Sequence, residues 1–356
     1  FALSAIQTLS FILVAHTVLE VRGMLFWQWI VLFSTACFGN IVGLNISAGM
    51  RSAVSIYILI PLILVPQLLL GGAMIKFDDL HKSLTRKVYV PVIGDIMATR
   101  WAYEALSVEQ YRSNRFQKPF FKYDMEISQN DWYASFLIPT LKVKVNECII
   151  AGKDPVYREY AENNFEKINF HFDELAEATG VQPGSWYSSM NYSEFNEIVG
   201  DDAKLYLDSL RVVLRLRNRH ISSVRDSLYT IMADEIGHEN LVKTREKDYN
   251  ESLADILLNR LTTSKIFETE DRLVQKADPV YMKPGSKYGR AHFFAPYKMI
   301  GSLKIGTLVF NVAVIWLMSL LLFVALYFDL LKKFNRFLEK QKLPFWRKFG
   351  RELLQI

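Results

Sequence analysis

The residues that could perform chemistry in this chain are few and scattered. Glu235 and His238 have the Glu-x-x-His spacing, which would place a carboxylate and an imidazole on one face of a helix. Carboxylate-bridged metal sites use this pair, but they need a second copy and further carboxylates from other helices, and the sequence holds a single copy. We therefore interpret the pair as a solvated helix face and predict no metal site.

Signatures of nucleotide and acyl chemistry are absent from the sequence. It contains no G-x-x-x-x-G-K-[ST], no H-E-x-x-H and no G-x-S-x-G, and Gly285-Ser286-Lys287 lacks the upstream glycine of a phosphate-binding loop. Cys148 has no histidine near it in sequence, and Cys37 lies in an apolar run, so neither a thiol nucleophile nor a disulfide is expected. We predict no catalytic residue in this chain.

The charges are segregated along the chain, and this pattern decides the fold class. Before Lys76 the charged residues are Glu20, Arg22 and Arg51, whereas charges are dense from Lys76 to Lys304. A bilayer core about 30 Å thick needs roughly 20 apolar helical residues. The sequence predicts a mainly α protein with about four spans and a large helical extracytoplasmic insert between the last two. The expected spans are about 1–19, 24–47, 54–75 and 305–328.

Basic residues after the last apolar run set the expected orientation. Lys332, Lys333 and the lysines and arginines beyond them indicate a cytoplasmic C-terminus, and the Arg51 link then also lies inside. The net charge of +5 gives no indication of nucleic-acid binding. The expected domains are the spans in 1–75, an outer-face re-entrant or interfacial segment over 76–115, the extracytoplasmic domain over 116–292, the last span in 293–331 and a basic cytoplasmic tail over 332–356.

Within the insert, apolar spacing and turn residues predict helices over 97–111, 157–179 and 201–216, with helices continuing to about Leu273. Residues 141–145 (LKVKV) fit a strand or a helix. In the spans, Asn40 and Asn45 are expected to hydrogen-bond between helices, and His16 has either a functional role or reaches the interface. Asn191 and Asn250 lie in sequons that a glycosylating compartment would modify.

One constellation carries a resemblance to a known family. An apolar helix with Pro61 and Pro66 ends in Gly71-Gly72, and a segment RWAYEAL follows at residues 100–106. In this order the chain resembles the membrane domain of ABC-2-type ABC transporters, and within them the ABCG/White branch. The resemblance covers about residues 1–111 and 293–335. The insert is larger than the corresponding loop of most animal members, which suggests a bacterial member with an extracytoplasmic domain.

The resemblance implies a dimeric ATP-driven pump in a cell membrane, the inner membrane if the protein is bacterial. The ATP-binding domain, with its ATP and Mg²⁺, would be a separate subunit or an upstream part of the same polypeptide. Because Phe1 opens within an apolar run, we expect further chain upstream, with residues 1–19 as the third span of six. The implied transport path includes Leu59, Ile60, Pro61 and Gln67. The implied outer-face motif consists of Arg100, Trp101, Tyr103 and Glu104.

Two functions follow from these observations. The first is the membrane part of an exporter of a lipid-like or amphipathic compound. The alternative is a membrane-anchored sensor or assembly protein whose extracytoplasmic domain binds a protein partner. Closely spaced spans with prolines and with Gly39 and Gly43 at small-xxx-small spacing exceed what an anchor needs, which favours the transporter.

Overall fold

The protein is represented by a computed structural model that describes residues 1–50, 52–81, 88–262 and 264–340. It consists of two compact units. The first is formed by Phe1–Leu84, Val90–Leu106 and Ile305–Ile356, and the second by Thr85–Tyr89 and Ser107–Lys304. Arg51 and the basic residues after Lys340 lie outside the described residues, so their expected place on the cytoplasmic side stays a prediction.

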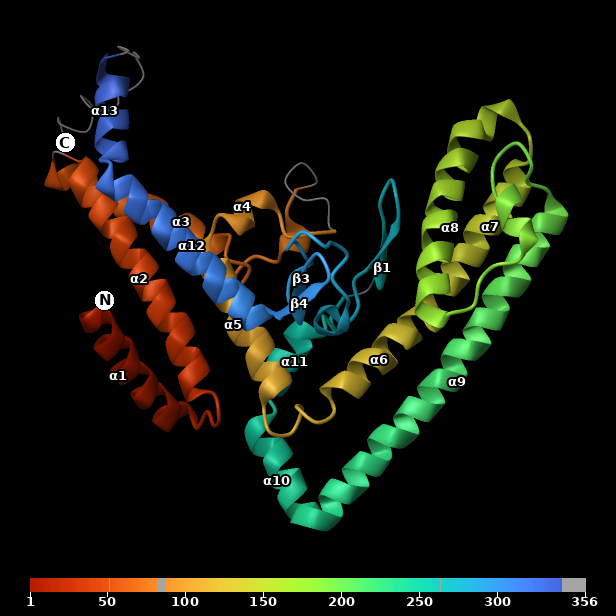
Figure 1. The fold of residues 1–356 in the computed structure, drawn as a ribbon, viewed down its shortest axis with the longest axis horizontal. Coiled ribbons are helices and arrows are strands. Elements are labelled where there is room, and N and C mark those ends of the chain that lie inside the picture. The colour runs from red at the N-terminus through yellow and green to blue at the C-terminus, as the bar shows by residue number, and fades with distance from the viewer. Residues whose placement is uncertain (51, 82–87, 263, 341–356) are drawn as a thin grey trace. The chain divides into compact units, whose positions relative to one another are not determined.

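The first unit consists mainly of helices (Figure 1), of which α1, α2, α3 and α12 are apolar. Helix α2 contacts both α1 and α12, so these three helices form its body. The elements of this unit are α1 (Ala2–Leu19), α2 (Leu25–Gly49), α3 (Ala53–Leu69), a 3₁₀ turn (Phe77–Asp79), α4 (Val92–Asp95), the first half of α5 (Ala98–Ser113), α12 (Thr307–Tyr327) and α13 (Leu330–Lys340).

Three helices, α1, α2 and α12, are long and apolar enough to cross a membrane among the described residues. The fourth expected span is shorter than the sequence indicated, because α3 has 17 residues and ends at Leu69 rather than Ile75. Gly72, three residues after the last helical residue, has a φ of +82°, a left-handed conformation in which the helix cannot continue. A Cβ on Gly71 would lie 2.9 Å from the Thr99 hydroxyl, so glycine permits the close approach of α5 here. The expected count of four spans is therefore not confirmed.

Polar side chains join the apolar helices at defined points. Asn40 on α2 donates to the Ser4 hydroxyl of α1 at 2.6 Å, and Asn45 donates to the Leu322 carbonyl of α12 at 3.0 Å. This confirms the expected role of both asparagines, since a polar group surrounded by apolar atoms is stable only with a partner. His16 forms a 2.5 Å hydrogen bond with Gln28, so its ring is used in the α1–α2 contact.

The second unit is built around a helical bundle, with short strands and loops beside it (Figure 1). Its helices are the rest of α5, α6 (Phe121–Trp132), a π-helical turn (Tyr133–Leu137), α7 (Ile138–Ala151), α8 (Arg158–Thr179), α9 (Glu197–Ile236), α10 (His238–Asp248) and α11 (Glu251–Leu257). Short 3₁₀ turns are Pro155–Tyr157, Ser185–Ser189 and Pro279–Tyr281, and the strands are β1 (Ile266–Glu268), β2 (Leu273–Gln275), β3 (Tyr297–Ile300) and β4 (Leu303–Gly306).

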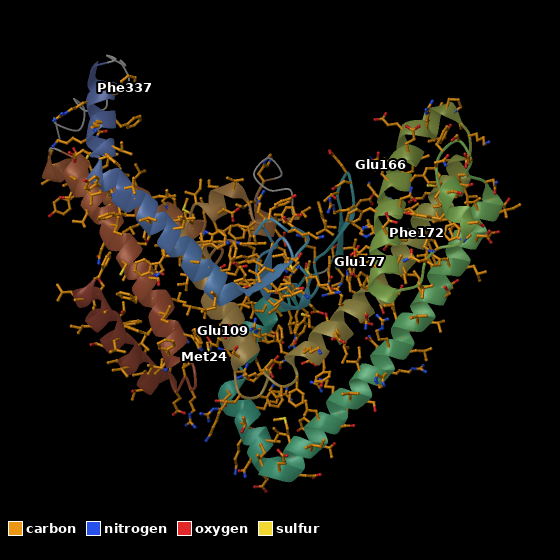
Figure 2. The ribbon with its side chains drawn as sticks, in the orientation of Figure 1. Met24, Glu109, Glu166, Phe172, Glu177 and Phe337 are labelled. Atoms are coloured by element: carbon orange, nitrogen blue, oxygen red, sulfur yellow. The ribbon has the colours of Figure 1, made fainter. Side chains whose placement is uncertain are left out.

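The bundle core lies between α7, α8 and α9. Phe172 of α8 is fully buried in it (Figure 2), together with Leu141 and Val145 of α7. Leu141 and Val145 are the first and last residues of the LKVKV segment, which is helical in the structure. Its apolar residues Leu141, Val145 and Cys148 recur at helical spacing and all face the core.

Two expectations for this unit are wrong. Helices do not continue to Leu273: α11 ends at Leu257, and the chain then forms the antiparallel β1–β2 hairpin, in which Phe267 pairs with Val274. Nor do Glu235 and His238 share a helix, because Gly237 between them has a φ of +85°, which ends α9 and begins α10. A left-handed glycine breaks the i,i+3 relation that the pair would need.

Glu268 is one of the groups that attach the β1–β2 hairpin to the bundle. Glu268 of β1 lies 2.8 Å from Nζ of Lys167 and 3.0 Å from Nζ of Lys144, two lysines that are almost fully buried. Burial alone would raise the pKa of the Glu268 carboxyl, but the hydrogen bonds from the two lysines outweigh it and lower this pKa below 4.5. Buried ammonium groups need such a partner, so Glu268 holds the hairpin in place.

Replacing Glu268 with Gln therefore lowers the free energy of unfolding by about 1–2 kcal/mol, less than the roughly 3–5 kcal/mol of a fully buried pair, because water screens this half-exposed carboxylate. A carboxyl whose pKa is lowered by folding stabilises the protein above its unfolded-state pKa, and this stabilisation is lost as the pH falls through the folded-state pKa. Thermal unfolding of the purified protein at falling pH measures the difference. Glu270→Gln, an exposed carboxylate of the same hairpin, is the matched control and should unfold like the wild type.

Candidate functional site

The first turns of α5 carry two fully buried charges within the apolar first unit. Arg100 and Glu104 are 1% and 0% exposed. Nη1 of Arg100 lies 3.5 Å from Oε2 of Glu104, one helical turn further on, and 3.8 Å from Oδ1 of Asp95. A buried cation and carboxylate are stable only together, so the pair fixes the rotamers of both side chains.

Asn311 connects this pair to the last apolar helix. It is fully buried on α12, and its Nδ2 donates to Oε2 of Glu104 at 2.9 Å and to the carbonyl of Trp101 at 3.0 Å. The sequence analysis missed this residue. The available signal was a lone asparagine inside an uncharged run of 24 residues, since such a polar group needs a partner from another helix.

Trp101 forms the apolar side of the same junction. Its ring lies 3.8 Å from the Arg100 guanidinium carbon, and its Nε1 donates to the Asp95 carbonyl at 2.8 Å. The ring belongs to a buried cluster with Val31 of α2 and Leu308 of α12. The junction of α5 with α2 and α12, which we call the α5 junction, is therefore both ion-paired and closely packed. Tyr103 lies half-buried on the same helix.

Gln67 is the expected path residue that the structure brings toward the α5 junction. Its backbone carbonyl accepts a hydrogen bond from the Thr99 hydroxyl, and its side-chain oxygen accepts one from the Thr99 amide at 3.3 Å. The end of α3 is thus tied to the first turn of α5. Both residues belong to the first unit, and Thr99 directly precedes Arg100 in the sequence.

The other three expected path residues, Leu59, Ile60 and Pro61, lie one to two turns earlier on α3. The structure describes all of α3, and no residue of this helix is buried. Ile60 is 38% exposed and Leu62 on the opposite side is 66% exposed. These apolar side chains are available to lipid or to another chain.

Neither catalysis nor metal binding is indicated at the α5 junction. In the part of the chain that the structure describes, no group of three or more histidine, cysteine, aspartate and glutamate side chains could hold a metal ion. The carboxylates here are already engaged by Arg100 and Asn311. Directional hydrogen bonds thus join α5 to the end of α3 and to α12.

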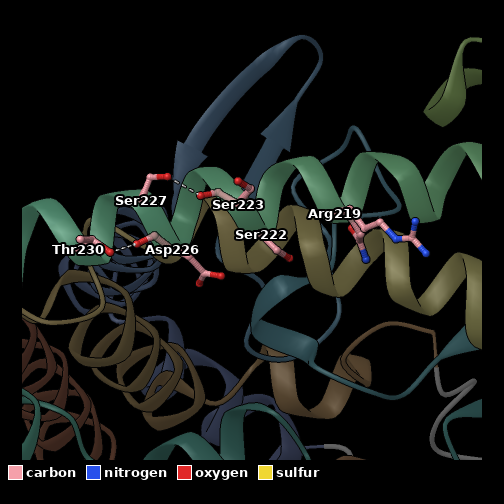
Figure 3. A pocket seen from close by; sticks show the side chains of 7 residues that line it. Arg219, Ser222, Ser223, Asp226, Ser227 and Thr230 are labelled. Atoms are coloured by element: carbon pink, nitrogen blue, oxygen red, sulfur yellow. Dashed lines mark hydrogen bonds between the residues drawn. The ribbon is translucent and has the colours of Figure 1, made fainter.

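A hollow of about 600 Å³ lies along α9 in the second unit (Figure 3). All the side chains that line it come from this one helix, and two of its hydroxyls are used within the helix: Ser227 donates to the Ser223 carbonyl and Thr230 to the Asp226 carbonyl. A single polar helix face encloses no ligand, so this hollow is not a candidate site.

Comparison with known families gives one match. Residues 1–111 match the model of the ABC-2 type transporter membrane family, so this part of the chain is similar to the membrane domain of such transporters. The match ends within α5 and includes the Arg100–Glu104 pair. Neither curated proteins nor solved structures give a match. The match and the three apolar helices together point to a membrane protein with a transporter-type permease region.

The ion pair predicts a non-additive mutant series. Arg100→Met and Glu104→Leu each leave one buried charge without its partner and should cost about 3–5 kcal/mol of stability. The double variant replaces both charges with apolar groups and should cost less than the sum. Thermal unfolding of the four proteins in one detergent measures the coupling. Additive effects would contradict the pairing, and Lys142→Met, which removes an exposed ion pair with Asp208, is a control with a small effect.

Proposed function

We propose that this chain is the membrane-domain part of an ATP-driven transporter of the ABC-2 type. The match of residues 1–111 to this membrane family is the observation that carries the proposal. The three apolar helices of spanning length support it, and so do the interhelical bonds of Asn40, Asn45 and Asn311, because a simple anchor needs no such connections.

The transport path in this proposal runs along α3. A helix that is open on two opposite faces within its own chain can contact a second subunit with one face and lipid with the other. Ile60 and Leu62 lie about 200° apart around α3, and both are open. We assign the face of Ile60 and Gln67, with Leu59 and Pro61 about 100° to either side of Ile60, to a second copy of the chain, which makes the functional unit a homodimer with the path between the copies. Lipid then covers the opposite face.

The energy source is an ATP-binding domain, either a separate subunit or another part of the same polypeptide. ATP and Mg²⁺ belong to that domain, and the chain described here binds neither. In this proposal the protein belongs to the ABCG/White branch in a bacterial inner membrane, with the C-terminus in the cytoplasm and the second unit outside. Its substrate is a lipid-like or amphipathic compound, and the direction is export.

A second candidate function is a membrane-anchored sensor or assembly protein. The second unit favours it, because that unit has its own buried core and a ligand-sized cavity beside the bundle. In this alternative the second unit would bind a partner, and the apolar helices would only anchor the protein in the membrane. Transport activity separates the two candidates.

Cross-linking tests the path along α3. Because both native cysteines are buried, the wild type should give little background on oxidation. We expect Ile60→Cys to form a disulfide-linked dimer in native membranes, whereas Leu62→Cys on the lipid-facing side should not. Non-reducing electrophoresis measures the product. Equal cross-linking at both positions, or none at Ile60, would contradict the assigned face.

Transport itself is tested with inside-out membrane vesicles from cells that produce the complete transporter. We expect ATP-dependent uptake of an amphipathic fluorescent dye, several-fold slower in Ile60→Trp because the larger ring narrows the path. Leu62→Trp adds the same ring on the opposite face and should transport like the wild type. If uptake is independent of ATP in all three proteins, the transporter proposal is wrong and the anchored sensor is favoured.

A further inference from the structure

The second unit has a cavity of about 350 Å³ between the bundle and the β1–β2 hairpin. It is lined by segments far apart in sequence: the end of α6, the C-terminal half of α8 where Glu177 lies (Figure 2), strand β2, the loop after Tyr281, and residues 88–89. Its volume is at the lower end of the roughly 300–1,000 Å³ of small-molecule sites. Enclosure by several segments distinguishes it from the single-helix hollow on α9.

Two neighbouring side chains in the lining have buried polar atoms without a partner. Gln129 and Trp132 are 7% and 4% exposed and lie three residues apart on α6, so they share one face of the helix. Nε1 of Trp132 and Oε1 of Gln129 have no hydrogen-bond partner among the described residues. A buried donor and a buried acceptor left unpaired are costly, and such atoms are usually satisfied by a ligand or water.

The buried and partly buried charged groups of the cavity, in contrast, are already engaged, whereas Glu177 and Lys283 of the lining are exposed to solvent. Glu174 accepts a hydrogen bond from the Tyr133 hydroxyl at 3.0 Å and lies 2.7 Å from Nδ1 of His171. His171 accepts from the Leu273 amide through Nε2, so Nδ1 carries the proton that it donates to Glu174. Arg272 is paired with Asp271. Among the buried lining residues, the groups left for a ligand are therefore a neutral indole donor and a neutral amide acceptor, which suits an uncharged ligand.

Aromatic side chains form the wall of the cavity. Phe170 and Tyr89 both line it, and an arginine lies against each ring: Arg272 at 4.5 Å from the Phe170 centroid and Arg290 at 5.5 Å from the Tyr89 centroid. These contacts hold the rings in fixed positions. An aromatic wall above a neutral donor and acceptor suits a molecule with apolar C–H faces and hydroxyl groups at its edge.

We propose that this cavity binds a sugar ring. One hydroxyl of the ring accepts from Nε1 of Trp132 and donates to Oε1 of Gln129, since a hydroxyl group is both acceptor and donor. The C–H face of the ring packs against Phe170 or Tyr89. The ring belongs either to a free sugar or to the headgroup of a glycolipid, because both present the same hydroxyl groups and C–H face. The site belongs to the second unit and does not depend on the transport proposal.

The test uses the full chain in lipid nanodiscs, because sugar-headed detergents would compete for the site. Saturation-transfer NMR and calorimetry with glucose, galactose and N-acetylglucosamine measure binding of free sugars. Binding of a lipid headgroup is measured in nanodiscs that contain a monohexosyl lipid, as protection of amides in the second unit from hydrogen exchange. Trp132→Phe keeps an aromatic side chain but removes the indole donor, and Gln129→Met keeps the size but removes the acceptor, together with the amide donor to Gln275. Each should weaken binding about three- to tenfold, the value of one hydrogen bond.

Trp186→Phe is the matched control, because Trp186 packs against the same bundle core outside the cavity, and it should bind like the wild type. If free sugars bind, the ligand of the cavity is a soluble sugar. If only the glycolipid protects the second unit from hydrogen exchange, the ligand is a lipid headgroup. The proposal is overturned if neither ligand binds, or if Trp132→Phe and Trp186→Phe weaken binding equally. In that case the two unpartnered atoms bind water only.

Discussion

The first unit depends on one constraint, that charges removed from water must be paired. Arg100 and Glu104 lie at the start of α5 among apolar side chains, and each is stable there only because the other is present. Asn311 extends the pair to α12, so the pair also fixes where the last apolar helix contacts α5. Trp101 then packs into the space between the helices. Packing alone would leave the rotation of α12 less defined, because lipid-like surfaces give no directional preference.

The same constraint explains the contrast between α3 and its neighbours. Helices α1, α2 and α12 are joined by directional bonds from residues such as Asn40 and Asn45, whereas α3 is attached chiefly at its end, through Gln67 and Thr99. An apolar helix held at one end and free along its length can change its position without breaking buried polar contacts. The proposed path along α3 would need this property, because transport requires alternate arrangements of the lining.

The second unit is stabilised differently. It has a hydrophobic core around Phe172, and Glu268 of its hairpin forms ion pairs with two buried lysines of the bundle. Its polar groups are mostly satisfied within the unit. Gln129 and Trp132 are exceptions beside a cavity, which is the pattern expected where a protein keeps groups for a ligand. Both units thus use buried polar groups to join their elements, and the second has in addition two unpartnered polar atoms beside its cavity.

The sequence by itself determined the apolar helices and the helical bundle, because charge segregation and 3.6-residue periodicity are local properties. It also identified residues 100–106 as a distinctive segment. Only the tertiary structure decided that Arg100 pairs with Glu104 inside an apolar unit and that Asn311, more than 200 residues away, completes the junction. It likewise decided that α3 ends at Leu69 and that 266–275 forms a hairpin. The physical reason is that pairing between distant segments leaves no periodic trace in the sequence, whereas burial of a helix face does.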